Sequence, residues 1–90
     1  MQFIKLHWFE KDGSCHKIEY KGEIAISVDE ITYVNVSEFN LSKSDINVKD
    51  KEFLYSINKE GNLSIVHTKI FELPEILVIE TVRDIFDFIR

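Results

Sequence analysis

The sequence predicts an α+β fold: a mostly antiparallel sheet of roughly five to seven strands, with one C-terminal helix packed on it. Apolar and polar residues alternate in several short segments, as in strands that bury one face. Turn-forming residues separate these segments, and apolar residues recur at helical spacing near the C-terminus. The 90 residues, 44% of them hydrophobic, are enough for one core, so residues 1–90 are expected to form a single domain.

The first strand is expected over residues 3–9. Ile4, Leu6 and Trp8 alternate with other residues there and would share one face. Residues 12–14, with the sequence Asp-Gly-Ser, then predict a turn.

The length of this turn sets the register of the first hairpin, because residues 15–20 alternate again. A three-residue loop pairs Trp8 with Ile18. It also pairs Leu6 with Tyr20, so that the apolar side chains share one face. A two-residue loop would place a lysine opposite Trp8, so we predict the three-residue loop.

Two further strands are predicted in the middle of the chain. Lys21-Gly22 interrupts the second strand, and apolar residues then alternate over residues 24–28. Residues 31–36 are rich in β-branched and aromatic side chains, which favours a strand. Residues 37–51 are mainly polar and charged, and we expect a loop there that contains a short irregular element.

A second hairpin is predicted from two alternating segments, residues 53–57 and 63–67. Lys59-Glu60-Gly61 lies between them. Gly at the third loop position suits a type I turn followed by a left-handed residue, the common three-residue hairpin. This loop would pair Ile57 with Leu63.

The last quarter of the chain is predicted to contain two β segments. Residues 70–73 are expected at a sheet edge, ended by Pro74. Residues 76–79 form a continuous, mainly β-branched run, which is typical of a central strand. A single helix from residue 74 to residue 90 is the alternative, and the β-branched run makes it less attractive.

A helix is expected to start at Thr81. Its side chain can cap the backbone N–H of Asp84, as in a capping box that has Asp in place of Glu. So short a helix is marginal alone in water and must dock on the sheet. Its predicted apolar stripe consists of Val82, Ile85, Phe86 and Ile89.

Three segments resemble the small flagellar-operon proteins of the FlbD type and their bacterial relatives. Residues 3–6 (FIKL) are similar to the leading strand of that family, and residues 24–31 are similar to its "I-N-x-D-x-I" stretch. Residues 78–85 are similar to its closing "V-K-E-S-V-E-E-V" segment. The chain departs from the pattern in a longer middle region and at Ser27, where the family has Asn or Asp. The resemblance covers about a third of the chain and implies a small antiparallel sheet closed by a C-terminal helix, with no catalytic motif.

The composition argues against several classes of function. The formal charge is −5, and Lys residues are interleaved with acids, as in residues 49–52, so a phosphate-binding surface for nucleic acid is not expected. No apolar stretch approaches the roughly 20 residues that span a bilayer, and the N-terminal residues do not resemble a signal peptide. One cysteine, Cys15, precludes an internal disulfide. We therefore expect a cytoplasmic protein that does not contact membranes.

The histidines and Cys15 are the candidates for metal binding or nucleophilic catalysis. In the predicted register His7 and Cys15 lie on the face opposite His16, so they cannot share a zinc ion with it. For the same reason His16 cannot serve as the base for Cys15. His67 could approach Cys15 only through an accident of the fold. We predict no metal site, no cofactor and no enzymatic activity.

Four large apolar residues fall on strand or helix faces that the prediction assigns to solvent. They are Phe9, Phe39, Leu54 and Phe88. Several such residues on one small domain indicate a covered second face or a surface for a protein partner. We favour the partner surface.

The functional prediction is therefore a small adaptor or regulatory protein that acts through protein–protein contact. Its partner would be another protein or a second copy of the chain in a homodimer. The alternative is an acidic inhibitor or immunity protein that blocks a toxin or nuclease, because acidic charge steers such proteins to basic targets.

Overall fold

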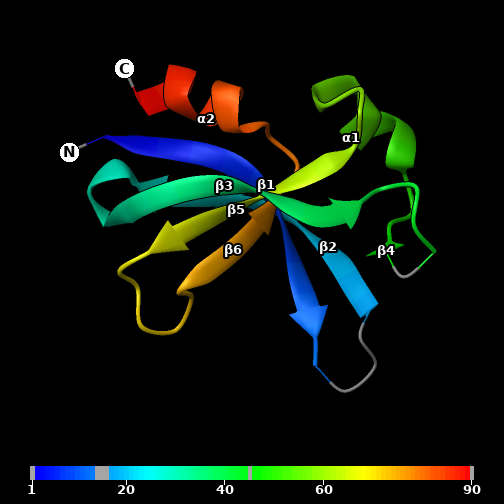
Figure 1. The fold of residues 1–90 in the computed structure, drawn as a ribbon, viewed down its shortest axis with the longest axis horizontal. Coiled ribbons are helices and arrows are strands. Elements are labelled where there is room, and N and C mark those ends of the chain that lie inside the picture. The colour runs from blue at the N-terminus through cyan, green and yellow to red at the C-terminus, as the bar shows by residue number, and fades with distance from the viewer. Residues whose placement is uncertain (1, 14–16, 45, 90) are drawn as a thin grey trace.

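The computed structural model describes residues 2–13, 17–44 and 46–89 and confirms the predicted α+β class. Strands and helices follow one another along the chain as shown in Figure 1. In chain order they are β1 (Phe3–Asp12), β2 (Lys17–Ser27), a 3-10 turn (Val28–Glu30), β3 (Ile31–Asn40), β4 (Ile46–Asn47), α1 (Lys51–Ile57), β5 (Asn62–Thr68), β6 (Glu75–Val78) and α2 (Val82–Ile89). Neither described α-helix is long and apolar enough to cross a membrane.

The six described strands form one mixed sheet in the order β3-β5-β6-β1-β2-β4. Its neighbouring strands are antiparallel except for the short parallel pair β2 and β4. The mixed sheet is a minor departure from the predicted, mostly antiparallel one. β6 lies between β5 and β1, so the prediction of a central strand near residues 76–79 is confirmed.

The sheet is strongly curled, because β2 and β3 are joined by only three residues although three strands lie between them. Four strand spacings in a flat sheet would separate β2 from β3 by about 19 Å. A three-residue 3-10 turn advances only about 6 Å. The turn is held to the residue that follows β5 by a hydrogen bond from Lys69 N to Glu30 O (2.8 Å). Figure 1 shows the strands crossing near the centre of the view and then diverging.

The sheet buries apolar side chains on both faces. Leu6 and Phe9 are three residues apart on β1 and therefore point to opposite faces, and both are buried. Leu6 belongs to a cluster that includes Ile85 of α2, whereas Phe9 belongs to a cluster that includes Leu54 of α1. The assignment of Phe9 and Leu54 to solvent was therefore wrong, because α1 covers a face that the sequence pattern left open.

The predicted register of the first hairpin was also wrong. Leu6 pairs with Ile24, and Trp8 pairs with Gly22. The strand that was expected to end at Lys21-Gly22 continues to Ser27 through a bulge, where Phe9 pairs with Tyr20. Gly22 adopts a φ of 104°, which lies in the region that favours glycine. Because Gly22 can adopt this conformation, β2 remains paired with β1 on both sides of the bulge.

The predicted hairpin between residues 53–57 and 63–67 does not form. Residues 51–57 are the helix α1, which begins where the Asp50 side chain accepts a hydrogen bond from Phe53 N (3.3 Å). β5 pairs with β3 and β6 instead. The expected loop over residues 37–51 is likewise only partly a loop, because β3 runs to Asn40 and β4 follows.

The C-terminal predictions agree better with the structure. The Thr81 side chain accepts a hydrogen bond from Asp84 N (3.0 Å), so the predicted cap is confirmed. Ile85 is buried as expected, but Phe86 is 55% exposed and does not belong to the buried stripe. Residues 70–73 lie in the loop between β5 and β6 and form no strand.

Candidate functional site

A groove lies where β1 and β6 separate. These two strands pair only at Trp8 with Val78 and at Phe9 with Leu77. Beyond Phe9, β1 continues alongside β2, while β6 is paired along its length with β5. Figure 1 shows the two strands diverging toward the lower edge of the view. The resulting groove has a volume of about 410 Å³, which is within the range of ligand sites in proteins.

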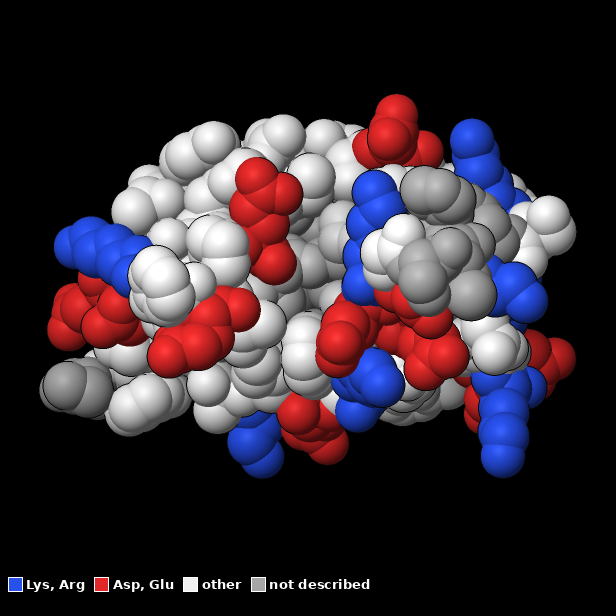
Figure 2. Space-filling view, turned by 90° about the horizontal axis from the view of Figure 1, so that it is seen from below, with Lys and Arg blue, Asp and Glu red and all other residues white. Residues whose placement is uncertain are grey.

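The floor and walls of the groove are mainly apolar, and its rim is charged. The apolar lining residues are Trp8, Phe9, Phe39, Ile65, Leu73 and Leu77. The charged lining residues are Glu10, Lys11, Glu72 and Glu75. Figure 2 views this side of the molecule and shows a hollow with both acidic and basic side chains at its border. The groove thus combines an apolar interior with a charged border.

The charges of the rim do not neutralise one another. Lys11 is its one basic residue, and the Lys11 Nζ lies 5.7 Å from the centre of the Phe39 ring, within the range of a cation–π contact. Glu75 Oε1 lies 3.9 Å from Nδ1 of His67. Glu10 and Glu72 are exposed to solvent. A ligand in the groove would therefore meet an excess of negative charge.

The groove also contains strand edges. Glu10 and Lys11 pair with β2 across one edge, and within the described residues no strand pairs with them across the edge toward β6. Glu75 and Ile76 pair with β5, and the described part of the chain supplies no strand on their other side. Such edges carry backbone groups that can pair with another strand.

The groove brings together two of the four residues that the sequence suggested for a partner surface. Phe9 and Phe39 both line it, although Phe9 is only 2% exposed and forms part of its floor. Leu54 is buried beneath α1. Phe88 is 43% exposed and lies beside Phe3 at the far end of the molecule, near the chain termini. The four residues therefore do not form one surface.

Most of the groove was not predictable from the sequence. Trp8 and Leu77 were assigned to strands, and their contribution to a groove depends on a pairing between residues about 70 positions apart. The acidic rim comes from two segments, β1 with Glu10 and residues 72–75, which lead into β6. No local sequence pattern indicates that these two segments meet.

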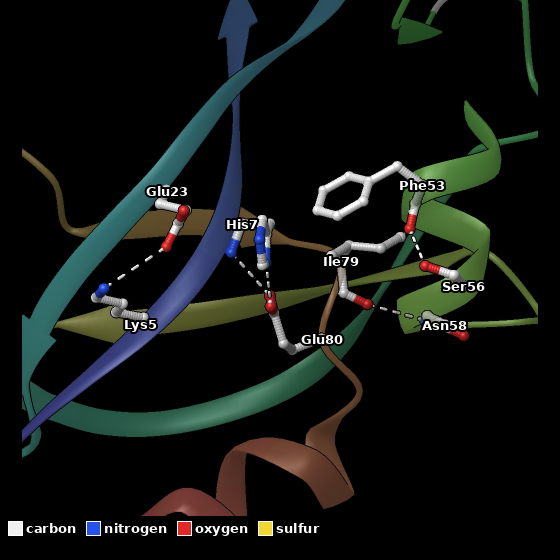
Figure 3. A network of polar contacts seen from close by, with 8 residues as sticks. All are labelled: Lys5, His7, Glu23, Phe53, Ser56, Asn58, Ile79 and Glu80. Carbon is white, nitrogen blue, oxygen red and sulfur yellow. Dashed lines mark hydrogen bonds and ion pairs between the residues drawn. The ribbon is translucent and has the colours of Figure 1, made fainter. Parts of the chain in front are cut away.

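A polar cluster that shares no residue with the groove lies around His7 and Glu80. Figure 3 shows the Glu80 carboxylate directed at His7. Glu80 Oε1 accepts a hydrogen bond from His7 N (2.9 Å), and Glu80 Oε2 lies 2.6 Å from His7 Nδ1. Glu80 is 3% exposed, and the His7 ring packs against the rings of Tyr20 and Phe53.

This pair extends the β1–β6 ladder. Ile79 N donates a hydrogen bond to His7 O (3.0 Å), and the Glu80 side chain then supplies the acceptor for His7 N. Burial raises the pKa of the neighbouring Tyr20 phenol, and the carboxylates of Glu23 and Glu80 raise it further. With its pKa raised above the ordinary value of 10.0, Tyr20 contacts His7 as an uncharged ring at neutral pH.

A carboxylate-oriented histidine also occurs in catalytic sites, where its other ring nitrogen faces a nucleophile. In this structure the aromatic rings of Tyr20 and Phe53 pack against the His7 ring.

The other candidates for metal binding or nucleophilic catalysis are two histidines and the cysteine. His67 Nε2 lies 2.7 Å from Asn35 Oδ1. Cys15 and His16 lie outside the described residues, and in the described part no three His, Cys, Asp or Glu residues are placed to hold a metal ion.

The groove and the His7–Glu80 pair are thus two candidate sites, and a further pocket of about 410 Å³ lies between Tyr20, Val48 and Phe53. The groove has an open volume, an apolar lining and a charge that would select a ligand. The His7–Glu80 pair is largely buried, and both oxygens of the Glu80 carboxylate contact His7. No protein-family model, no curated protein and no solved structure matches the chain, so its function is argued from this geometry.

Proposed function

We propose that the chain is a non-catalytic protein-binding domain and that the groove between β1 and β6 is its binding surface. The observation that carries the proposal is the apolar lining of the groove, with Trp8, Ile65 and Leu77 half-buried within it. Half-buried aromatic and aliphatic side chains in a concave site are the usual anchors of protein interfaces. A partner that completes their burial would gain hydrophobic free energy.

Charge complementarity supports a protein partner with a basic surface. The rim has three glutamates for one lysine, and the whole chain has a formal charge of −5. Acidic charge around an apolar site raises the rate of encounter with basic partners and disfavours acidic ones. The same charge disfavours nucleic acid, whose phosphates would meet the glutamates.

The proposal predicts that peptides selected for binding to the chain depend on the groove. A random peptide library displayed on phage is panned on the immobilised chain. Enriched peptides are expected to bind an Ile65→Ala/Leu73→Ala variant about tenfold more weakly than the native chain, because both substitutions remove apolar lining. Affinities are measured by fluorescence anisotropy with labelled peptides.

The matched control is Val36→Ala, which removes an exposed apolar side chain from β3 outside the groove. Circular dichroism verifies that each variant is folded before its affinity is compared. Peptides that bind the double variant as tightly as the Val36→Ala control would contradict the proposal. A library that yields no binding peptide would contradict it as well.

A further inference from the structure

We infer that the groove binds an extended segment of a partner protein, in which lysine or arginine alternates with apolar residues. This inference rests on the proposed function and specifies its ligand. The segment would lie along the exposed edge of β1 or β6 and add a strand to the curled sheet. It is supported by three features of the groove: its backbone edges, its apolar lining and its charged rim.

The backbone edges favour an extended ligand over a helix. Glu10 and Lys11 on β1, and Glu75 and Ile76 on β6, have a strand partner on one side only within the described residues. A helix satisfies its own backbone groups and would leave these edges unpaired.

The backbone groups that face the groove belong to one residue on each strand. Backbone groups of alternate residues point to the same edge of a strand. His7 and Ile79 bond to each other across the β1–β6 pairing. The residues whose N–H and C=O groups face the groove are therefore Lys11 and Glu75. An added strand would pair with these groups, which supply affinity in this mode of peptide recognition.

The apolar lining specifies one set of side chains of the ligand. Successive residues of a strand point to opposite sides, so alternate residues would face the groove. There they would meet half-buried Ile65 and Leu77, which pair with each other and share one face of the sheet, whereas Trp8 points to the opposite face. Apolar side chains at these positions would be removed from water, whereas charged ones would lose hydration without gaining a partner.

The rim specifies the other set of side chains. Residues that point to the opposite face would lie near Glu10, which shares that face with Trp8, while the other glutamates line the rest of the rim. Lys11 already contacts the Phe39 ring, so the glutamates outnumber the cations available to them on the rim. Lysine or arginine on the ligand would be attracted by this excess, and aspartate or glutamate would be repelled.

The test uses two nine-residue peptides as probes. One has lysine at odd positions and valine or threonine at even positions, and the other has glutamate in place of each lysine. Trp8 is the only tryptophan of the chain and lies in the groove, so its fluorescence reports binding directly. The lysine peptide is expected to bind the native chain at least tenfold more tightly than the glutamate peptide, and its affinity should fall as salt is added.

Charge reversal of the rim provides the decisive comparison. A Glu10→Lys/Glu72→Lys variant is expected to bind the lysine peptide at least tenfold more weakly and the glutamate peptide more tightly than the native chain does. The matched control, Glu60→Lys/Asp87→Lys, changes the net charge equally at exposed positions that do not line the groove. It is expected to retain the preference for the lysine peptide.

Several results would overturn the inference. The glutamate peptide could bind the native chain as tightly as the lysine peptide, or the rim variant could bind the lysine peptide as tightly as the control. A helical circular dichroism signal from the bound peptide would refute the extended conformation. If library peptides depend on the groove but are not basic, this inference fails while the proposed function stands. If no peptide depends on the groove, both fail.

Discussion

An Asn58→Ala variant is expected to have a free energy of unfolding about 3–4 kcal/mol lower than that of the native chain. Asn58 is only 6% exposed and makes four hydrogen bonds. Its Nδ2 donates to Asn62 O (2.8 Å) and Ile79 O (3.0 Å). Its Oδ1 accepts from Glu60 N (3.2 Å) and Gly61 N (3.3 Å). Alanine removes all four bonds and deprives the buried Ile79 O of its Asn58 donor, while Gly61 N keeps its bond to the backbone oxygen of residue 58.

The location of Asn58 explains why this loss should affect the whole fold. Asn58 follows the last residue of α1, and its side chain reaches both the start of β5 and Ile79 at the end of β6, as Figure 3 shows in part. The measurement is urea-induced unfolding followed by circular dichroism. Asn47→Ala is the control, because Asn47 is exposed on β4. A difference of less than about 1 kcal/mol between the two variants would contradict the role given to Asn58.

A Glu80→Ala variant is expected to lose about 3 kcal/mol of stability at neutral pH. The substitution leaves His7 N without its acceptor inside the sheet and removes the charge-assisted bond to His7 Nδ1. Since Glu80 bonds His7 next to the short β1–β6 pairing, its loss should also weaken the floor of the groove. Thermal and urea unfolding measure the loss of stability.

Two further variants separate the contributions of Glu80. Glu80→Gln keeps an oxygen that can accept from His7 N, so it is expected to lose less stability than Glu80→Ala. Glu23→Ala removes the carboxylate of an exposed ion pair, in which Lys5 Nζ and Glu23 Oε2 lie 4.0 Å apart, and should have little effect. Equal stability of the Glu80→Ala and Glu23→Ala variants would refute the structural role of Glu80.

The features that were predictable from the sequence are local ones. Alternation located β1, and the Thr81–Asp84 spacing located the start of α2, because each depends on residues close together in the chain. The same reasoning misassigned α1. Phe53, Tyr55 and Ile57 alternate like a strand, and the competing signal, Asp50 as a helix cap, is a single residue.

The features that were missed depend on contacts between distant segments. The burial of Phe9 follows from α1 covering a second face of the sheet, which residues 3–9 alone do not reveal. The bulge opposite Trp8 and Phe9 shifts the hairpin register, and Gly22 gave only a signal of interruption. The groove exists because β1 and β6 pair briefly and then diverge, which is a property of the topology.

Amide hydrogen exchange measured by NMR, with and without the lysine peptide, tests most directly whether the groove binds an added strand. We predict that amide exchange slows at Lys11 or at Glu75, whose backbone groups face the groove and would form hydrogen bonds with a new strand. The Trp8 indole resonance should shift in the same titration. Protection confined to the outer edge of β3 or to the surface around Phe3 and Phe88 would contradict the account.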